Sequence, residues 1–178
     1  MARREHGGDS GETDLLGGRR VAKSDVRIEA LGALDEATSA LGVARQGVQR
    51  PQAGEVLRQA QRDLYQLMAE LAMPPEHPKR ERVTADRVEW VEQALDELEA
   101  AVTIPAKFVL PGACTASASV DYARAVVRRA ERRVVEVAHA EGAPNPYLLT
   151  YINRLSLLLY MVARAEDVAA GVDFDIAG

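Results

Sequence analysis

Apolar residues recur every three or four positions in five stretches of the chain, a spacing that predicts five amphipathic α-helices. These stretches cover about residues 27–48, 52–73, 84–98, 120–140 and 145–162. Two of them open on residues that suit a helix start, because Thr84 begins the third, and Asn145 with Pro146 begins the fifth. The pattern therefore predicts an all-α bundle of five helices.

A glycine-rich polar segment precedes the first helix. We expect residues 1–25 to form a loop and residues 26–170 to form the bundle, within a single domain over residues 1–178. The 178 residues, of which 47% are apolar, are enough for one core. Only 4% are aromatic, which favours helices over a β-sandwich.

Charge and cysteine content narrow the class of protein further. A formal net charge of −5 argues against nucleic-acid binding. Cys114 is the only cysteine, so no internal disulfide can form and a reducing compartment is the natural setting. No apolar signal region begins the chain, and Asn153 and Arg154 interrupt its longest apolar stretch. We expect a cytoplasmic protein that does not span a membrane.

The fourth predicted helix is dense in arginine. Five arginines fall within ten residues: Arg124, Arg128, Arg129, Arg132 and Arg133. At about 100° per residue, Arg124, Arg128 and Arg132 share one face, with Glu131 beside them. The guanidinium group binds phosphate or carboxylate through two parallel hydrogen bonds and does not lose its proton. The run predicts a site for a small anion, and the alternative is a solvated charged face.

The N-terminal segment has the composition of a phosphate-binding loop. It contains Gly7, Gly8, Gly11, Gly17 and Gly18, together with Thr13, Arg19, Arg20 and Lys23. Glycine lets backbone N–H groups converge on an anion, while threonine adds a donor and lysine a positive charge. The segment lacks the G-K-[ST] sequence of a Walker loop. The alternative interpretation is a flexible tail.

Two further features suit substrate binding. Phe108 lies beside a proline–glycine turn, where it is either a core anchor or a ligand contact. A polar stripe on the fifth helix comprises Asn153, Ser156, Tyr160 and Arg164. Asn153 bonds either a ligand or a neighbouring helix. Neither the cysteine nor the histidines have the spacing of a catalytic triad or zinc site, so we expect a protein that binds and positions its substrates.

Six segments, in this order, resemble the PduO-type ATP:cob(I)alamin adenosyltransferases. They are G-D-S-G-E-T at 8–13, G-G-R-R-V-A-K at 17–23, R-I-E-A-L-G-A-L-D-E at 27–36, F-V-L-P-G at 108–112, A-R-A-V-V-R-R-A-E-R at 123–132 and Y-I-N-R-L-S at 151–156. The resemblance covers nearly the whole chain and implies the ferritin-like, five-helix fold of this family. It also implies transfer of the 5′-deoxyadenosyl group of ATP to the cobalt(I) of a reduced corrinoid, which gives adenosylcobalamin and triphosphate.

The resemblance also implies roles for individual residues. The implied ATP-binding residues are His6, Gly7, Gly8, Thr13, Asp14, Lys23, Arg128, Arg129, Glu131, Arg132 and Asn153. The implied catalytic residues are Arg128 and Phe108, of which Phe108 crowds the lower face of the corrin and displaces its axial base. Asp35 and Arg124 are expected to pair across the interface of a homotrimer whose active sites lie between subunits. Mg²⁺ and a corrinoid reductase are the implied cofactor and partner.

Several positions near the implied site depart from the family pattern. They are Glu5 and Gly7 in place of threonines, Asp14 in place of a small hydroxyl residue, Ala113 in place of a glycine, Asp121 in place of a histidine and Leu157 in place of an aspartate. Acidic groups beside a polyanion weaken ATP binding unless Mg²⁺ or an arginine compensates for them. We expect Asp121 to pair with Arg124 or Arg128 of its own helix.

Three functions are compatible with the sequence. The first is a working adenosyltransferase with altered loop contacts. The second is a weak or inactive family member that acts as an ATP- or corrinoid-binding carrier or sensor. The third is an oligomeric helical bundle with an unrelated ligand.

Overall fold

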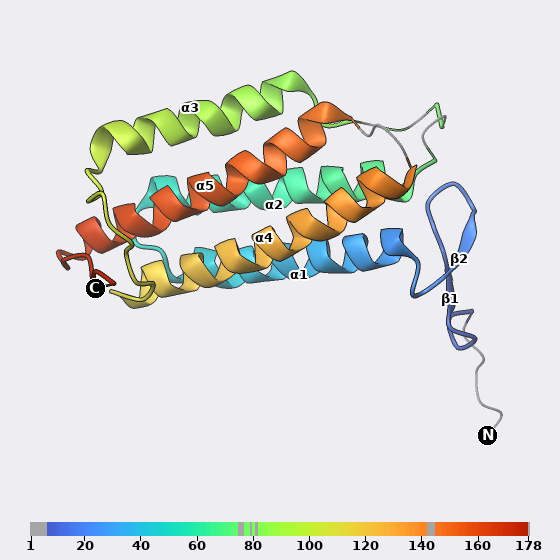
Figure 1. Ribbon diagram of the computed structural model, residues 1–178, viewed down its shortest axis with the longest axis horizontal. Helices are drawn as coiled ribbons and strands as arrows, with labels where there is room; N and C mark the ends of the chain where they lie inside the picture. Colours follow the sequence, from blue (N-terminus) through green and yellow to red (C-terminus); the bar gives the residue numbers. More distant parts are fainter. Residues whose placement is uncertain (1–6, 75–76, 79, 81, 142–144, 178) are drawn as a thin grey trace.

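Five helices dominate the computed structural model, which describes residues 7–74, 77–78, 80, 82–141 and 145–177. They are α1 (Val26–Gly47), α2 (Pro51–Ala72), α3 (Ala85–Ala101), α4 (Thr115–Glu141) and α5 (Pro146–Ala169). The helices run roughly along one axis (Figure 1); α1 packs against α2 and α4, and α5 packs against α4 and α3. The predicted all-α bundle is confirmed.

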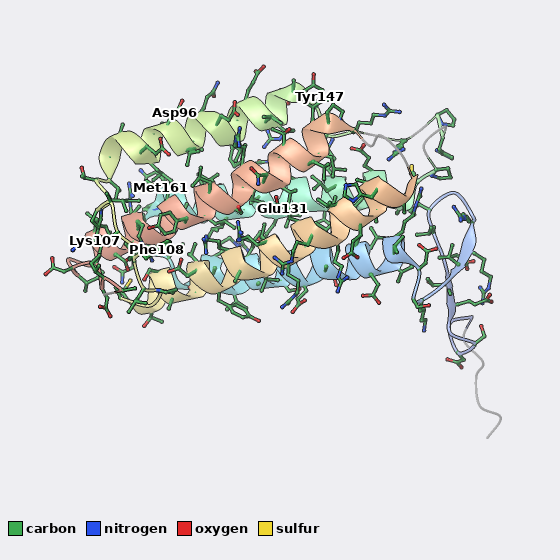
Figure 2. All side chains as sticks on the ribbon, viewed as in Figure 1. Asp96, Lys107, Phe108, Glu131, Tyr147 and Met161 are labelled. Atoms are coloured by element: carbon green, nitrogen blue, oxygen red, sulfur yellow. The ribbon has the colours of Figure 1, made fainter. Side chains whose placement is uncertain are left out.

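The core lies where the helix faces meet, which explains why the apolar spacing predicted the helices. Its leucines and valines include Leu34 and Leu41 of α1, Leu64 and Leu67 of α2, Val127 and Val134 of α4, and Leu155 and Leu159 of α5. On α3 only one narrow face is buried, through Val88, Val91 and Leu95. Charged and polar side chains cover the outer faces of the helices (Figure 2).

The helix α4 begins at Thr115, earlier than the position near 120 that the sequence indicated. Cys114 and Ser117 stabilise this start through reciprocal hydrogen bonds. The Ser117 amide donates to Cys114 Sγ at 3.4 Å, and the Cys114 amide donates to Ser117 Oγ at 3.2 Å. This is the arrangement of a capping box with cysteine in the cap position. Asp121 therefore lies well inside the helix.

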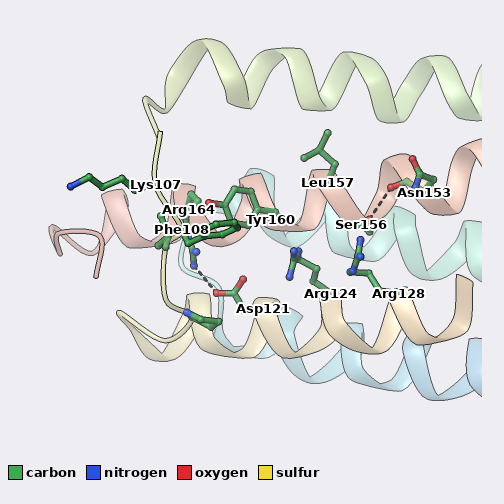
Figure 3. Close-up of a pocket in the computed structure, with 12 residues that line it drawn as sticks. Lys107, Phe108, Asp121, Arg124, Arg128, Asn153, Ser156, Leu157, Tyr160 and Arg164 are labelled. Carbon is green, nitrogen blue, oxygen red and sulfur yellow. Dashed lines mark hydrogen bonds and ion pairs between the residues drawn. The ribbon is translucent and has the colours of Figure 1, made fainter. Parts of the chain in front are cut away.

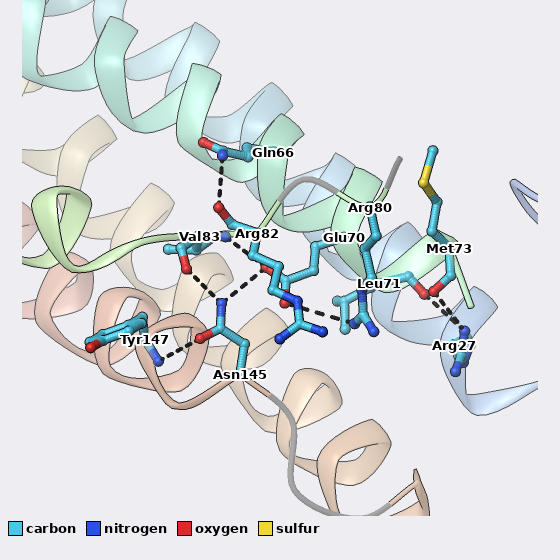
Figure 4. Close-up of polar contacts among 10 residues, drawn as sticks. All are labelled: Arg27, Gln66, Glu70, Leu71, Met73, Arg80, Arg82, Val83, Asn145 and Tyr147. Carbon is cyan, nitrogen blue, oxygen red and sulfur yellow. Dashed lines mark hydrogen bonds and ion pairs between the residues drawn. The ribbon is translucent and has the colours of Figure 1, made fainter. Parts of the chain in front are cut away.

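Asn145 fixes the start of α5 and ties it to the segment between α2 and α3 (Figure 4). Its side-chain oxygen accepts a hydrogen bond from the Tyr147 amide at 3.2 Å, as expected of a helix cap. Its side-chain nitrogen donates to the Val83 carbonyl at 2.6 Å. Glu70 of α2 accepts a hydrogen bond from the Val83 amide at 2.7 Å. Asn145 thus links the start of α5 to Val83, just before α3, and Val83 in turn contacts α2 through Glu70.

A buried carboxylate joins α2, α3 and α5. Asp63 accepts hydrogen bonds from the Tyr151 hydroxyl at 2.6 Å and from Arg87 Nη2 and Nε at 2.7 and 3.0 Å. Burial of Tyr151, the negative charge of Asp63 and the hydrogen bond between them raise the pKa of Tyr151 well above its usual value. The folded state therefore holds the phenolic proton more tightly than the unfolded state does.

Replacing Tyr151 by phenylalanine should lower the free energy of unfolding by about 2 kcal/mol at neutral pH, because Asp63 loses a donor. The contribution of the tyrosine is complete below its unfolded pKa of about 10 and is lost as the pH rises toward the folded pKa. The difference between wild type and variant should therefore shrink above about pH 10, as measured by urea unfolding. Tyr122→Phe is the control, because Tyr122 is exposed. A difference that stays constant with pH would contradict this account.

The described part of the glycine-rich segment contains a short antiparallel hairpin. Its strands are β1 (Glu12–Asp14) and β2 (Arg20–Ala22). Leu15 and Val21 are buried against Ala72, which anchors the hairpin at one end of the bundle (Figure 1). Gly17 turns the chain with a φ of 91°, and a Cβ there would lie 2.9 Å from Pro74. No pattern in the sequence indicated these strands, because three residues are too few to show an alternation.

Candidate active site

A pocket of about 530 Å³ opens between α4 and α5 (Figure 3). From α4 it is lined by Asp121, Arg124 and Arg128, and from α5 by Asn153, Ser156, Leu157, Tyr160 and Arg164. The arginine face of α4 and the polar stripe of α5, which the sequence showed separately, therefore meet in one site.

Two arginines of α4 face this pocket with unpaired guanidinium groups. Arg124 is half-buried, and its guanidinium lies 5.5 Å from the centre of the Tyr160 ring. Arg128 is exposed one helical turn further along. Neither of the two forms a salt bridge with any residue that the structure describes. Two such charges at the wall of a pocket attract an anion.

Two other arginines implied in ATP binding point elsewhere in this chain. Arg129 forms a salt bridge with Glu36 of α1 at 2.5 Å. Arg132 donates a hydrogen bond to the Arg128 carbonyl at 2.9 Å. Neither lines the pocket, so this part of the run is a solvated face within one chain.

Asn153 links the two helices that form the pocket. Its Nδ2 donates to Glu131 Oε1 at 2.9 Å. The inter-helix hydrogen bond that the sequence left open is therefore present, and Asn153 still lines the pocket. The bond holds two of the implied ATP-binding residues side by side.

Asp121 pairs with Arg164 of α5, so the prediction of a pair with Arg124 or Arg128 is wrong. Asp121 Oδ2 lies 2.6 Å from Arg164 Nη2. The carboxylate is buried, and this burial raises its pKa although the charge of Arg164 opposes the shift. A buried carboxylate is best compensated by a buried cation, which Arg164 supplies. The charge of half-buried Arg124 also lowers the pKa of Asp121, as a smaller contribution.

Arg164 is a pocket residue for which the sequence indicated neither a partner nor a role. It is fully buried, its Nε lies 2.9 Å from Asp167 Oδ2, and its guanidinium lies 5.2 Å from the Tyr160 ring. Tyr160 thus contacts two guanidinium groups, those of Arg164 and Arg124. The sequence placed Arg164 on the polar stripe, but its partner Asp121 lies 43 positions away and leaves no local signal.

Phe108 stands at the pocket with 86% of its surface exposed, so the core-anchor alternative is wrong. The C-terminal segment holds its backbone, because the Ala177 amide donates to the Phe108 carbonyl at 2.9 Å. The Leu110 amide in turn donates to the Asp175 carbonyl at 2.7 Å. An exposed ring on a fixed backbone suits contact with a large apolar ligand.

The N-terminal candidates lie in the hairpin region, at one end of the bundle, and none of them lines the pocket. Those described are Gly7, Gly8, Thr13, Asp14 and Lys23. A Cβ on Gly8 would lie 3.1 Å from Lys23 Nζ, so the glycine permits the close approach of this ammonium group. Asp14 Oδ1 lies 3.4 Å from Arg20 Nη1, so an arginine compensates for the negative charge of this carboxylate. His6 and Glu5 fall outside the described residues.

Asp35 lies on another face of the bundle from Arg124. It is exposed and lines an apolar hollow between α1 and α2, together with Leu16, Tyr65 and Met68. Arg124 lines the pocket between α4 and α5. Within one chain the expected pair does not form.

The fold and the site define a class: helical bundles with an arginine-lined pocket beside an exposed aromatic side chain. The chain belongs to the cobalamin adenosyltransferase family, whose sequence profile matches residues 5–166. The described residues contain no group of three or more side chains suited to hold a metal ion. None of the described helices is both long and apolar enough to cross a membrane.

Relatives of known name agree with this assignment. The chain is 40% identical over 162 residues to the corrinoid adenosyltransferase PduO of Salmonella typhimurium, with 90% of this chain and 48% of that protein covered. It is 40% identical over 167 residues to a corrinoid adenosyltransferase of Mycobacterium bovis, with 90% and 86% covered. The chain therefore spans about half the length of the PduO relatives.

A solved structure has the same fold. It is a variant of the PduO-type ATP:corrinoid adenosyltransferase from Lactobacillus reuteri, complexed with cobalamin and ATP. The TM-score is 0.89 at 26% identity, with 96% of this chain and 94% of that chain covered. The family resemblance that the six segments indicated is confirmed.

Proposed function

We propose that this chain transfers the 5′-deoxyadenosyl group of ATP to the cobalt(I) of a reduced corrinoid. The observation that carries the proposal is the pocket between α4 and α5, where Arg128, which forms no salt bridge with the described residues, shares one cavity with exposed Phe108. Guanidinium groups suit a triphosphate, and an exposed ring suits the flat face of a corrin. Relatives that are named for this activity support the proposal.

The reaction explains why the site needs no nucleophilic side chain. The electron pair of cobalt(I) attacks the ribose C5′, the C5′–oxygen bond breaks, and triphosphate leaves with the electrons of that bond. The protein then has two tasks, to align C5′ with the cobalt and to stabilise the charge of the leaving group. We assign the second task to Arg128. Phe108 would exclude the axial base from the lower face of the corrin.

We further propose that the complete site forms between neighbouring subunits of a homotrimer. Within one chain, the hairpin with Lys23 does not reach the pocket, and Asp35 lies on another face from Arg124. A second copy could bring both groups to the pocket. Leu16 and Tyr65 expose apolar surface beside Asp35, which favours burial of this face in an assembly.

Replacing Asp35 by alanine should weaken the trimer about tenfold in its dissociation constant, because Arg124 of the neighbour loses its partner. Sedimentation velocity over a range of protein concentrations measures this change. Exchanging the two residues, Asp35→Arg with Arg124→Asp, should recover part of the loss. Asp96→Ala on the outer face of α3 is the control. An unchanged assembly in Asp35→Ala would contradict the interface pair.

The remaining requirements follow from the proposed substrates. Mg²⁺ would enter bound to ATP, because proteins commonly hold this ion through substrate phosphates rather than through a cage of side chains. Cobalt(I) must be produced by reduction, so we propose a corrinoid reductase as partner and the reducing cytoplasm as setting.

Mixing the protein with chemically reduced cobalamin, ATP and Mg²⁺ tests the proposal. We expect the cobalt(I) absorbance to decay and adenosylcobalamin to form. A stable absorbance together with ATP binding in calorimetry would instead identify a carrier or sensor. Failure of both measurements would indicate an unrelated ligand.

A further inference from the structure

The guanidinium group of Arg20 contacts four polar groups of the N-terminal hairpin and the turn before it. Arg20 Nε lies 3.0 Å from Glu12 Oε2, and Nη1 lies 3.4 Å from Asp14 Oδ1. Nη2 donates to the Gly7 carbonyl at 2.6 Å and lies 3.4 Å from Ser10 Oγ. All three nitrogens of the side chain are therefore engaged within the segment that carries the implied ATP-binding glycines.

The register of the hairpin explains why Arg20 reaches both carboxylates. Asp14 is directly opposite Arg20 in the ladder, and Glu12 lies two residues before Asp14 on the same face. Thr13 pairs with buried Val21 and belongs to the other face. The hairpin thus has one charged face. Through the Gly7 carbonyl this face extends to the turn at residues 7–10, which we call the glycine turn.

The charges of this segment are balanced. Residues 7–23 contain three acidic and three basic side chains, so the segment is formally neutral. Without Arg20, the carboxylates of Glu12 and Asp14 would lose this partner beside the glycine turn, which is the proposed binding segment for the triphosphate of ATP. Charges separated by less than about 8 to 10 Å are only partly screened at physiological salt. Their repulsion would act directly on the nucleotide.

We propose that Arg20 is a positioning residue for ATP binding, which acts by neutralising Glu12 and Asp14 so that the glycine turn can accept a triphosphate. This inference rests on the proposed function but concerns the hairpin alone. It explains how the chain carries Asp14 at a position where the family has a small hydroxyl residue. Asp14 and Arg20 form an ion pair, so the added negative charge is neutralised within the hairpin itself.

Calorimetric titration of the full chain with MgATP tests the role of Arg20. Arg20→Ala should weaken ATP binding about tenfold, while Arg58→Ala, which removes the same charge from an exposed salt bridge with Glu55 on α2, should change it less than about twofold. The triple variant Glu12→Gln, Asp14→Ser, Arg20→Ala should bind ATP within about threefold of the wild type. In turnover assays Arg20→Ala should raise the KM for ATP and leave kcat within about twofold.

The possible outcomes separate this inference from the function on which it rests. Equal effects of Arg20→Ala and Arg58→Ala would overturn it, because net charge alone would then explain the loss. A triple variant as weak as Arg20→Ala would overturn it as well, since the unpaired carboxylates would not be the cause. In both cases a wild type that binds ATP and turns over leaves the proposed function intact. A wild-type protein that binds no ATP would contradict both the role of Arg20 and the proposed function.

Discussion

Alanine in place of Arg128 should lower the rate of the proposed transfer about a hundredfold and leave the protein folded. Arg128 is exposed at the pocket and forms no salt bridge with the residues that the structure describes, so its side chain holds no helix in place. Its contribution would arise when triphosphate departs and negative charge grows on the leaving oxygen. Losing one preorganised contact of this kind typically adds about 3 kcal/mol to the barrier.

Stopped-flow decay of cobalt(I) absorbance at saturating ATP measures the effect, and urea unfolding checks the fold. Arg133→Ala is the matched control, because Arg133 lies on the same helix, pairs with Glu136 at 2.9 Å and does not line the pocket. Arg128→Lys should fall between wild type and alanine, since lysine keeps the charge but not the two-pronged geometry. A rate for Arg128→Ala close to that of the wild type would mean that the triphosphate binds elsewhere.

The helices were predictable because each one buries a single face, and burial imposes a period of three to four residues on the sequence. The same logic failed where a polar helix cap, or one contact between distant positions, determines the structure. The reciprocal hydrogen bonds of Cys114 and Ser117 extend α4 by a turn that carries little apolar signal. The ion pair of Asp121 with Arg164 crosses from α4 to α5 and is invisible to reasoning about one helix at a time.

In the site as well, the sequence predicted which residues share a helix face but not which partners they contact. Periodicity placed Arg124, Arg128 and Arg132 on one face of α4. The structure sets the first two at the pocket, while Arg132 bonds the Arg128 carbonyl and does not line the pocket. Periodicity could not say that Arg129 turns toward Glu36 on α1, because that choice depends on which helix packs alongside. The exposure of Phe108 was likewise beyond the sequence, since a phenylalanine beside a turn is compatible with either a core or a surface position.

Phe108→Ala should reduce the proposed transfer about a hundredfold when the reaction starts from cobalt(II)-cobalamin with a reductant present, while ATP binding stays unchanged. The ring is 86% exposed, so its removal creates no cavity and should not lower stability. In the proposed complex the ring occupies the lower face of the corrin and excludes the axial base, which makes reduction to cobalt(I) less unfavourable. Without the ring the base can remain bound to cobalt. The loss would then lie in the population of the reactive species rather than in nucleotide contacts.

The absorption spectrum of cobalt(II)-cobalamin bound together with MgATP reports this population independently of turnover. The wild type should shift the spectrum to that of the base-free form, and Phe108→Ala should not. Tyr122→Ala removes another exposed aromatic side chain, one on α4 that does not line the pocket, and should behave as the wild type. An unshifted wild-type spectrum, or a shift that survives in Phe108→Ala, would contradict the assignment.

Combining Phe108→Ala with Arg128→Ala then asks whether the two residues serve different substrates. If Phe108 acts on the corrin and Arg128 on the triphosphate, their effects on the barrier should add within about 0.5 kcal/mol, because the side chains share no partner. If both acted by holding one shared conformation of the pocket, the second substitution would cost little after the first. Additivity, with the spectral shift lost in Phe108→Ala and kept in Arg128→Ala, is the result that the separate roles require.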